Sequence, residues 1–214
     1  MSSNMACNGK MRRVSMAPYK TLYNRFLRWS RMGVFNNIFT ELVKTAGKDG
    51  RLMIDATHFK AHRTAASLLK KGLFPAVSDA RRAGLNSKLH AVCDGHGRPL
   101  AMALTEGQVS DYKGATLLMD ALLEAGELLA DRGYDADWFR DALLTRGITP
   151  CIPPKKNRKR PISYDKNLYK QRHKIEIMFG RIKDWRRIAM RYDRCAHTFF
   201  SALCLAASVI FYLN

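Results

Sequence analysis

The segment from Tyr169 to Lys183 constrains the fold of this chain more than any other part of the sequence. At about 100° per residue, a helix over this stretch gathers four polar side chains on one narrow face, namely Tyr169, Arg172, Glu176 and Lys183. The neighbouring face is filled by large apolar side chains, namely Ile175, Met178, Phe179, Ile182 and Trp185. Such an amphipathic helix has to bury its apolar face against a core. The sequence therefore predicts a helix that holds one carboxylate among cations at the margin of a packed domain.

The positive charge of the chain is concentrated in two regions. The 214 residues include 37 Lys and Arg against 18 Asp and Glu, which gives a formal net charge of +19. Residues 155–194 hold 15 of these cations and 4 of the acids, and residues 1–50 hold 9 cations and 2 acids. Clustered Lys and Arg bind nucleic acid through the release of counterions from phosphates. We therefore expect DNA-binding surfaces on both sides of a near-neutral domain; the alternative is a basic protein with no partner.

Other features narrow the class of protein. The five cysteines are isolated from one another in sequence, which favours a reducing compartment over a disulfide framework or a zinc ribbon. The N-terminus lacks the apolar segment of a secretory signal. The longest apolar run, Thr198–Leu213, has 16 residues and falls short of the ~20 that a membrane span needs. We expect a cytoplasmic protein with no membrane partner and a buried C-terminal helix.

The expected elements follow from periodicity and turn signals. Residues 1–16 show no period, so we expect them to be disordered, and residues 17–46 have the spacing of helices. Strands are expected at 51–59, 87–93, 99–105, 127–131 and 147–152, and helices at 110–124, 135–146, 169–183 and 198–213. Asp135 is expected to cap the second of these helices. This order of strand, hairpin, helix, strand, helix, strand and helix is that of an RNase H-like α/β domain, a mixed sheet flanked by helices.

Three carboxylates stand where such a fold can bring them together. Asp55 ends the first strand, Asp131 ends the fourth, and Glu176 lies on the helix described above. Carboxylates at strand ends can point into a cleft. A set of this kind can hold two divalent ions ~4 Å apart, which activate a water or sugar hydroxyl and stabilise the leaving oxygen of a phosphodiester. Oxygen ligands favour Mg²⁺.

Each residue also has a simpler interpretation. Asp55 and Asp131 can be turn-forming acids at the ends of strands. Arg172 and Glu176, four residues apart, can be a surface ion pair worth a few tenths of a kcal/mol. The three acids together, in this order and on these element types, are more specific than any one of them.

These residues carry a family resemblance. The chain resembles the bacterial insertion-sequence transposases of the DDE type, whose helix motif Y-x2-R-x3-E-x6-K is matched in all four places by Tyr169, Arg172, Glu176 and Lys183. The stretches MIDAT around Asp55 and LADRGY around Asp131 are similar to the family's two aspartate motifs. The resemblance runs from about residue 18 to the C-terminus.

The resemblance implies an RNase H-like fold and a function. It implies Mg²⁺-dependent DNA strand cleavage and strand transfer at the terminal inverted repeats of an insertion sequence, with Mn²⁺ as a substitute metal. Asp55, Asp131 and Glu176 would be the catalytic acids and would hold the metals. The implied partners are the terminal inverted repeats, the target DNA and further copies of the chain assembled on DNA. The implied location is the bacterial nucleoid in the cytoplasm.

DNA-binding residues are expected at two places. By the resemblance, Arg172 and Lys183 would contact phosphates near the scissile bond, and Tyr169 would position the DNA or the helix. The basic loop after residue 154 adds candidates by its charge, and these are Lys155, Lys156, Arg158, Lys159 and Arg160.

The resemblance also suggests how the chain is divided. Related proteins carry a longer helical region before the segment that matches Tyr19–Trp29, so we expect a shortened copy. Residues 17–50 would be the helical remnant of an N-terminal DNA-binding region, and residues 51–214 the RNase H-like DDE catalytic domain. The alternative is a truncated, inactive transposase remnant that only binds DNA. Less favoured readings are a zinc hydrolase that uses His58 and His62, and a ribosomal or nucleoid protein.

Overall fold

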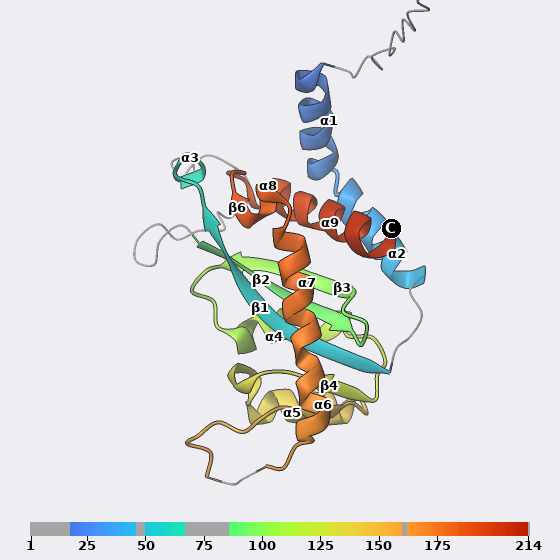
Figure 1. The fold of residues 1–214 in the computed structure, drawn as a ribbon, viewed down its shortest axis with the longest axis vertical. Coiled ribbons are helices and arrows are strands. Elements are labelled where there is room, and N and C mark those ends of the chain that lie inside the picture. Colours follow the sequence, from blue (N-terminus) through green and yellow to red (C-terminus); the bar gives the residue numbers. More distant parts are fainter. Residues whose placement is uncertain (1–17, 46–49, 67–85, 160–161, 214) are drawn as a thin grey trace, which may run out of the picture.

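A computed structural model of the chain describes residues 18–45, 50–66, 86–159 and 162–213 (Figure 1). Residues 1–16, which we predict to be disordered, lie outside the described residues. The strands are β1 (Arg51–Ala61), β2 (Asn86–Asp94), β3 (Pro99–Glu106), β4 (Glu127–Leu129), β5 (Thr149–Cys151) and β6 (Met190–Arg191). The helices are α1 (Tyr19–Arg31), α2 (Val34–Thr45), α3 (Arg63–Ala66), α4 (Asp111–Leu118), α5 (Asp137–Thr145), α6 (Lys166–Tyr169), α7 (His173–Lys183), α8 (Arg186–Ala189) and α9 (Ala196–Tyr212). Short 3-10 turns are η1 (Met119–Ala121), η2 (Arg132–Tyr134) and η3 (Lys170–Arg172).

The strands form one mixed sheet in the order β3-β2-β1-β4-β5. The first three pair antiparallel, and the last two join in parallel after helical crossovers. The turn between β2 and β3 uses Gly97 at φ +80°, a backbone conformation that glycine adopts without a steric cost. This arrangement confirms the predicted mixed sheet flanked by helices. The short strand β6, which the sequence did not predict, pairs with the end of β1.

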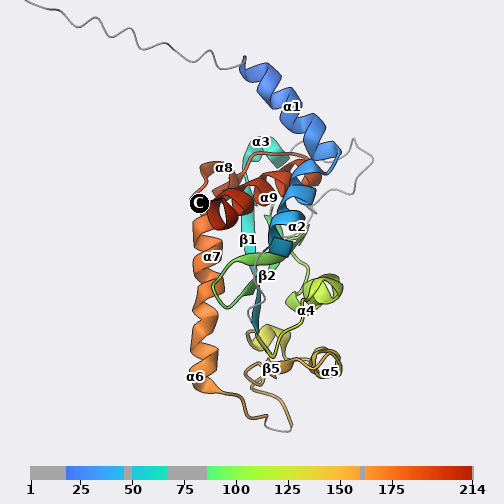
Figure 2. The ribbon, with the colours of Figure 1, turned by 90° about the vertical axis from the view of Figure 1, so that its right-hand side faces the viewer.

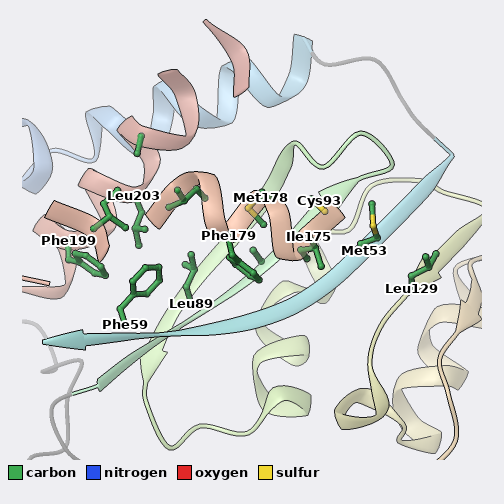
Figure 3. Packing of buried hydrophobic residues seen from close by; sticks show 14 of the residues in the cluster. Met53, Phe59, Leu89, Cys93, Leu129, Ile175, Met178, Phe179, Phe199 and Leu203 are labelled. Carbon is green, nitrogen blue, oxygen red and sulfur yellow. The ribbon is translucent and has the colours of Figure 1, made fainter. Parts of the chain in front are cut away.

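Helices cover both faces of the sheet, and each face has its own core. Figure 2 shows α7 on one side and α4 and α5 on the other. Alternate residues of a strand point to opposite faces. Met53 and Phe59 of β1 therefore pack under α7 and α9 (Figure 3), whereas Leu52 and Ile54 pack under α4 and α5. Because β1 is central and long, it carries side chains to both layers.

Helices α2 and α9 meet in a third, smaller core. Phe35, Phe39 and Val43 of α2 pack on Cys204 and Ala207 of α9. The apolar C-terminal helix is thus buried by contact with α2 and the sheet, as the sequence predicts. No helix among the described residues is long and apolar enough to span a membrane. Beyond this contact, α1 projects away from the body of the molecule (Figures 1 and 2).

The helix predicted at 169–183 is not uniform. Tyr169 ends α6, residues 170–172 form the 3-10 turn η3, and the regular α-helix begins only at His173. The buried stripe is largely as predicted, since Ile175, Met178, Phe179 and Ile182 are 0–5% exposed. Trp185 is an exception at 37% exposure, because α7 ends at Lys183 and Trp185 lies at the N-terminus of the next helix.

Two predicted positions of acids need correction. Asp55 does not end its strand, because pairing of β1 with β2 continues to Lys60 and with β6 to Ala61. Asp135 does not cap the helix after it, which begins at Asp137 with Ala136 in the capping position. The Asp135 carboxylate is instead buried between the guanidinium groups of Arg140 and Arg158, at 2.8 and 3.0 Å. Two nearby guanidinium groups outcompete a local cap for this side chain.

Candidate active site

Strand β1 presents Asp55 on the face of the sheet that α7 covers. Residues 53, 55, 57 and 59 alternate onto one face of the strand. Because Met53 and Phe59 pack in the core beneath α7, Asp55 and Thr57 point to this face as well. The Oδ1 atom of Asp55 accepts a hydrogen bond from the backbone N–H of Ala56 at 2.8 Å. Its other oxygen, Oδ2, is directed at Arg172. Asp55 is therefore fixed on the central strand, with one oxygen free of the backbone.

The pairing of β1 with β4 determines where Asp131 lies. These strands are parallel, with Met53 opposite Leu129. Asp55 and Asp131 each lie two residues beyond this pair. Asp131, which follows the end of β4, is therefore beside Asp55. Asp131 also caps η2, since its Oδ1 accepts the N–H of Gly133 at 2.8 Å. The acid of β1 and the acid that follows β4 thus lie near each other.

Glu176 reaches the site from α7 through Arg172. The guanidinium of Arg172 donates from Nη1 to Asp55 Oδ2 at 2.6 Å and from Nη2 to Glu176 Oε1. The Arg172 side chain is 18% exposed and that of Asp55 is 18%, whereas that of Glu176 is 55% exposed. A single cation therefore joins the acid of β1 to the acid of α7. The ion pair of Arg172 and Glu176 is more than a surface ion pair, because Arg172 also bonds Asp55.

The other two residues of the helix motif lie at the two ends of this arrangement. The ammonium of Lys183 donates to Thr57 Oγ1 at 2.6 Å and lies 5.1 Å from the centre of the Phe59 ring. The Tyr169 ring lies 5.9 Å from the guanidinium carbon of Arg172 and packs edge-on against Tyr164. Arg172 and Lys183 therefore bond Asp55 and Thr57 of β1, whereas Tyr169 packs beside Arg172.

The electrostatics of the site follow from burial and from these charges. Burial raises the pKa of the Asp55 carboxyl and Asp131 adds to the rise, against the lowering effect of the Ala56 N–H and of Arg172. Although burial alone lowers it, the pKa of Arg172 is raised by Asp55, Tyr169 and Glu176. Burial lowers the pKa of Lys183. Burial is thus the main cause of the raised pKa of Asp55, and repulsion from the Asp131 carboxylate is a smaller contribution.

The donor set of the site suits a hard divalent cation. Asp55, Asp131 and Glu176 offer only carboxylate oxygens, the ligands that Mg²⁺ and Mn²⁺ accept. In their present positions, however, no three His, Cys, Asp or Glu side chains of the described part of the chain are gathered closely enough to hold an ion. Arg172 lies between two of the three acids. The chemistry of the residues fits a divalent metal ion, and Arg172 is bonded to two of the acids that would hold it.

The basic loop divides into two groups. Lys155, Lys156 and Lys159 are exposed. Arg158 lies inward, where it pairs with Asp135 at 3.0 Å and with Asp137. Arg160 lies outside the described residues. Of the cations predicted to bind DNA here, the three lysines are open to solvent, and Arg158 holds the loop against α5.

Several residues near the site were not singled out from the sequence. A Cβ atom at Gly133 would lie 2.9 Å from Asp131 Oδ1 and 3.2 Å from Asp111 Oδ2, so Asp111 is a further acid close by. Asp111 pairs with Lys88 of β2 at 2.7 Å, and Lys88 is 8% exposed. A lysine within an otherwise apolar strand was the available signal for Asp111. Thr57 gave no signal.

The two histidines of the zinc hypothesis have other partners. His62 contacts Thr64 Oγ1 through Nδ1 at 2.8 Å and stacks on Tyr192 with ring centres 4.8 Å apart. His58 is opposite Lys88 in the β1–β2 pairing, on the face away from Asp55. A lysine beside a ligand position disfavours a cation there. The geometry thus gives no support to a zinc site at this pair.

Acids from two neighbouring parallel strands and from a helix on the same face of an RNase H-like sheet define a class, the enzymes that cleave and join nucleic-acid strands. Within that class the chain belongs to the DDE transposase family, because the family model described as "Transposase DDE domain" matches residues 46–210. DNA cleavage and strand transfer in transposition is the general activity of this family. Divalent metal ions are its general cofactors. The predicted family, fold and enzyme class are confirmed.

Relatives of known sequence agree with this assignment. The chain is 35% identical over 127 residues to a putative transposase for insertion sequence element IS6501 of Brucella ovis, covering 59% of this chain and 98% of the relative. It is 33% identical over 147 residues to a putative transposase for insertion sequence element IS402 of Burkholderia cepacia, covering 64% of this chain and 66% of the relative.

A solved structure agrees in fold. The chain superimposes on the piggyBac transposase of a synaptic complex with hairpin DNA with a TM-score of 0.53 and 10% sequence identity. The match covers 89% of this chain and 52% of that one. At this identity the likeness supports the fold alone.

Proposed function

We propose that this chain carries out Mg²⁺-dependent strand cleavage and strand transfer at the terminal inverted repeats of an insertion sequence, with Asp55, Asp131 and Glu176 as its catalytic acids. The observation that carries the proposal is the ion-pair cluster on Arg172, which joins Asp55 of β1 to Glu176 of α7 beside Asp131. Residues from three distant parts of the sequence meet at one place that no core packing requires. Mn²⁺ is proposed as a substitute metal.

The residues of the chain have distinct parts in this proposal. Asp55, Asp131 and Glu176 would supply oxygen ligands to the metal ions. When bound, such ions activate the attacking oxygen and stabilise the leaving oxygen of the phosphodiester. Arg172 offers two parallel donors to a phosphate, and Lys183 a point charge. These cations would hold the DNA backbone along β1, so that the scissile phosphate lies over the acids.

DNA binding away from the acids is proposed for two further surfaces. Lys155, Lys156 and Lys159 are exposed in the segment that follows β5. Residues 17–50 are proposed as part of a DNA-binding region, with the catalytic domain at 51–214. Helix α1 supports this, since it projects from the body and carries basic residues without an acid. Such surfaces give affinity without reading sequence.

The setting of the reaction is also a proposal. Joining two transposon ends to one target requires at least two copies of an active site, so we expect the chain to assemble as a homo-oligomer on DNA. The relatives belong to bacterial insertion sequences, so we propose action on the bacterial chromosome, in the cytoplasm.

A cleavage assay tests the proposal. The chain is incubated with labelled duplex DNA that carries the inverted repeats flanking its own gene, with Mg²⁺ or with a chelator. We expect strand cleavage with Mg²⁺, and its loss in Asp55→Asn and in Asp131→Asn. Binding of the same DNA without cleavage by the native chain would instead support the alternative, an inactive remnant that only binds DNA.

A further inference from the structure

We infer that Arg172 closes the catalytic centre in the absence of DNA, by holding Asp55 and Glu176 as an internal cation, and that a DNA phosphate releases both acids when it takes up this guanidinium. Metal binding by the chain would then depend on DNA. This inference rests on the proposed function of the three acids. It adds a second role to Arg172, beyond the phosphate contact expected from the family motif.

In the structure, Arg172 bonds two carboxylates at once. Its Nη1 and Nη2 atoms go to two different carboxylates, on β1 and on α7. Arg172 donates to Oδ2 of Asp55, because Oδ1 already accepts a hydrogen bond from the backbone N–H of Ala56. Charge-assisted bonds of this kind are short and strong, and they compete directly with any other cation for the same oxygens.

The position of Arg172 allows a change of partner. The residue lies in η3, at the junction between α6 and α7, and not in the interior of the regular helix. Its side chain is 18% exposed and Glu176 is 55% exposed, so one side of the cluster faces solvent. A long side chain at such a place can exchange a carboxylate for a phosphate by rotation, without moving the sheet.

Charge gives the exchange a direction. Without DNA, the guanidinium offsets one of the negative charges of three neighbouring acids, and a divalent ion has to displace it. With DNA, phosphates attract Arg172 and add negative charge at the site. By linkage, a ligand that removes Arg172 from the acids tightens metal binding, and metal tightens DNA binding by the same factor. Such coupling typically amounts to about 5–150-fold. Metal would therefore accumulate in the site only where DNA is present.

The test is a Mn²⁺ titration of the full chain, followed by electron paramagnetic resonance, with and without duplex DNA of the inverted repeat. For the native chain we expect weak binding alone and a dissociation constant lower by about tenfold with DNA. Arg172→Gln should bind Mn²⁺ about tenfold more tightly than the native chain in the absence of DNA, and DNA should add little. Arg172→Lys, which keeps the charge but loses the fork, should lie between the two.

Arg181→Gln is the matched control. It removes one arginine from the same helix, and Arg181 donates to the Ile210 carbonyl rather than to an acid. The variant should keep the native Mn²⁺ affinity and the native coupling to DNA. Thermal unfolding of each variant checks that it is folded.

Two results would contradict the inference. If Arg172→Gln and Arg172→Lys bind Mn²⁺ no more tightly than the native chain, and DNA still tightens binding in all of them, Arg172 does not close the site. The proposed function would then stand. If neither the native chain nor any variant binds Mn²⁺ with DNA, the assignment of the three acids as metal ligands is wrong, and the inference fails with it.

Discussion

Gly133 shows at the scale of single residues how the backbone sets the position of Asp131. Its N–H donates to Asp131 Oδ1, and its missing side chain leaves room for the carboxylates of Asp131 and Asp111 on either side. Gly133→Ala would place a methyl group 2.9 Å from Asp131 Oδ1. The flexible carboxylate, rather than the backbone, would have to give way.

We therefore predict that Gly133→Ala keeps the fold but lowers metal-dependent cleavage by about a hundredfold, because a displacement of about 1 Å at a catalytic group has that effect. Gly180→Ala is the control, since nothing lies within 4 Å of its added Cβ on α7, and it should raise the free energy of unfolding by about 0.5–1 kcal/mol. Cleavage rates and urea unfolding of both variants are the measurements. Native cleavage by Gly133→Ala would show that Asp131 tolerates displacement.

His90 is a buried histidine that makes the stability of the chain depend on pH. It is fully buried on the face of β2 under α4, where its Nε2 contacts Thr105 Oγ1 at 3.0 Å. Burial lowers the pKa of His90 to about 4, with Lys88 and His58 adding to the shift and Asp111 opposing it. The folded chain thus keeps His90 neutral, whereas the unfolded chain protonates it below about pH 6.5.

The sign of the pH effect follows from this difference. Between about pH 6.5 and 4 the unfolded state binds the additional proton, so the stability contributed by neutral His90 is present above pH 6.5 and is lost as the pH falls. His90→Gln should remove this part of the pH dependence. His173→Gln, on the exposed side of α7, should leave it in place. The free energy of unfolding by urea is measured at pH 7 and at pH 5 for each variant. If His90→Gln loses as much stability between these two pH values as the native chain does, the account is contradicted.

Among the elements, the basic loop of residues 155–159 can be tested by separating its two kinds of cation. If Lys155, Lys156 and Lys159 each meet a phosphate, replacing all three by Gln should weaken DNA binding and reduce the slope of log affinity against log salt by up to about three units. Arg158→Gln should instead lower the thermal unfolding temperature, because it leaves the buried Asp135 with one partner fewer. Equal slopes for the triple variant and the native chain would show that this loop does not contact DNA.

Most elements could be predicted from the sequence, and the exceptions have local causes. The strands β1, β2 and β3 and the helices α7 and α9 follow from apolar periodicity, because burial on one or both faces imposes it. Periodicity could not show that Tyr169 and Arg172 lie outside the regular part of the helix, because a 3-10 turn changes few side-chain directions over one turn. Asp135 was misplaced because its partners Arg140 and Arg158 are brought to it by the fold.

For the whole molecule, the sequence could single out Asp55, Asp131 and Glu176 as candidate acids but could not show how they are held. The order of the strands places Asp131 beside Asp55, and the helix motif supplies Glu176. The bridge through Arg172 depends on the distance between α7 and β1, which is set by Met53, Phe59, Ile175, Met178 and Phe179 in the shared core (Figure 3). Packing of this kind cannot be read from spacing in a single sequence. Thr57 could not be found for the same reason.

The measurement that tests the central claim most directly is DNA cleavage by Glu176→Gln. The substitution keeps the shape of the side chain and removes its charge, and the fold should be unaffected because the side chain is 55% exposed. On DNA with the inverted repeats and Mg²⁺, we predict that cleavage falls by several orders of magnitude relative to the native chain, while DNA binding holds or tightens because one negative charge near the phosphates is gone. Cleavage by Glu176→Gln at the native rate would contradict the assignment of this acid to the catalytic centre.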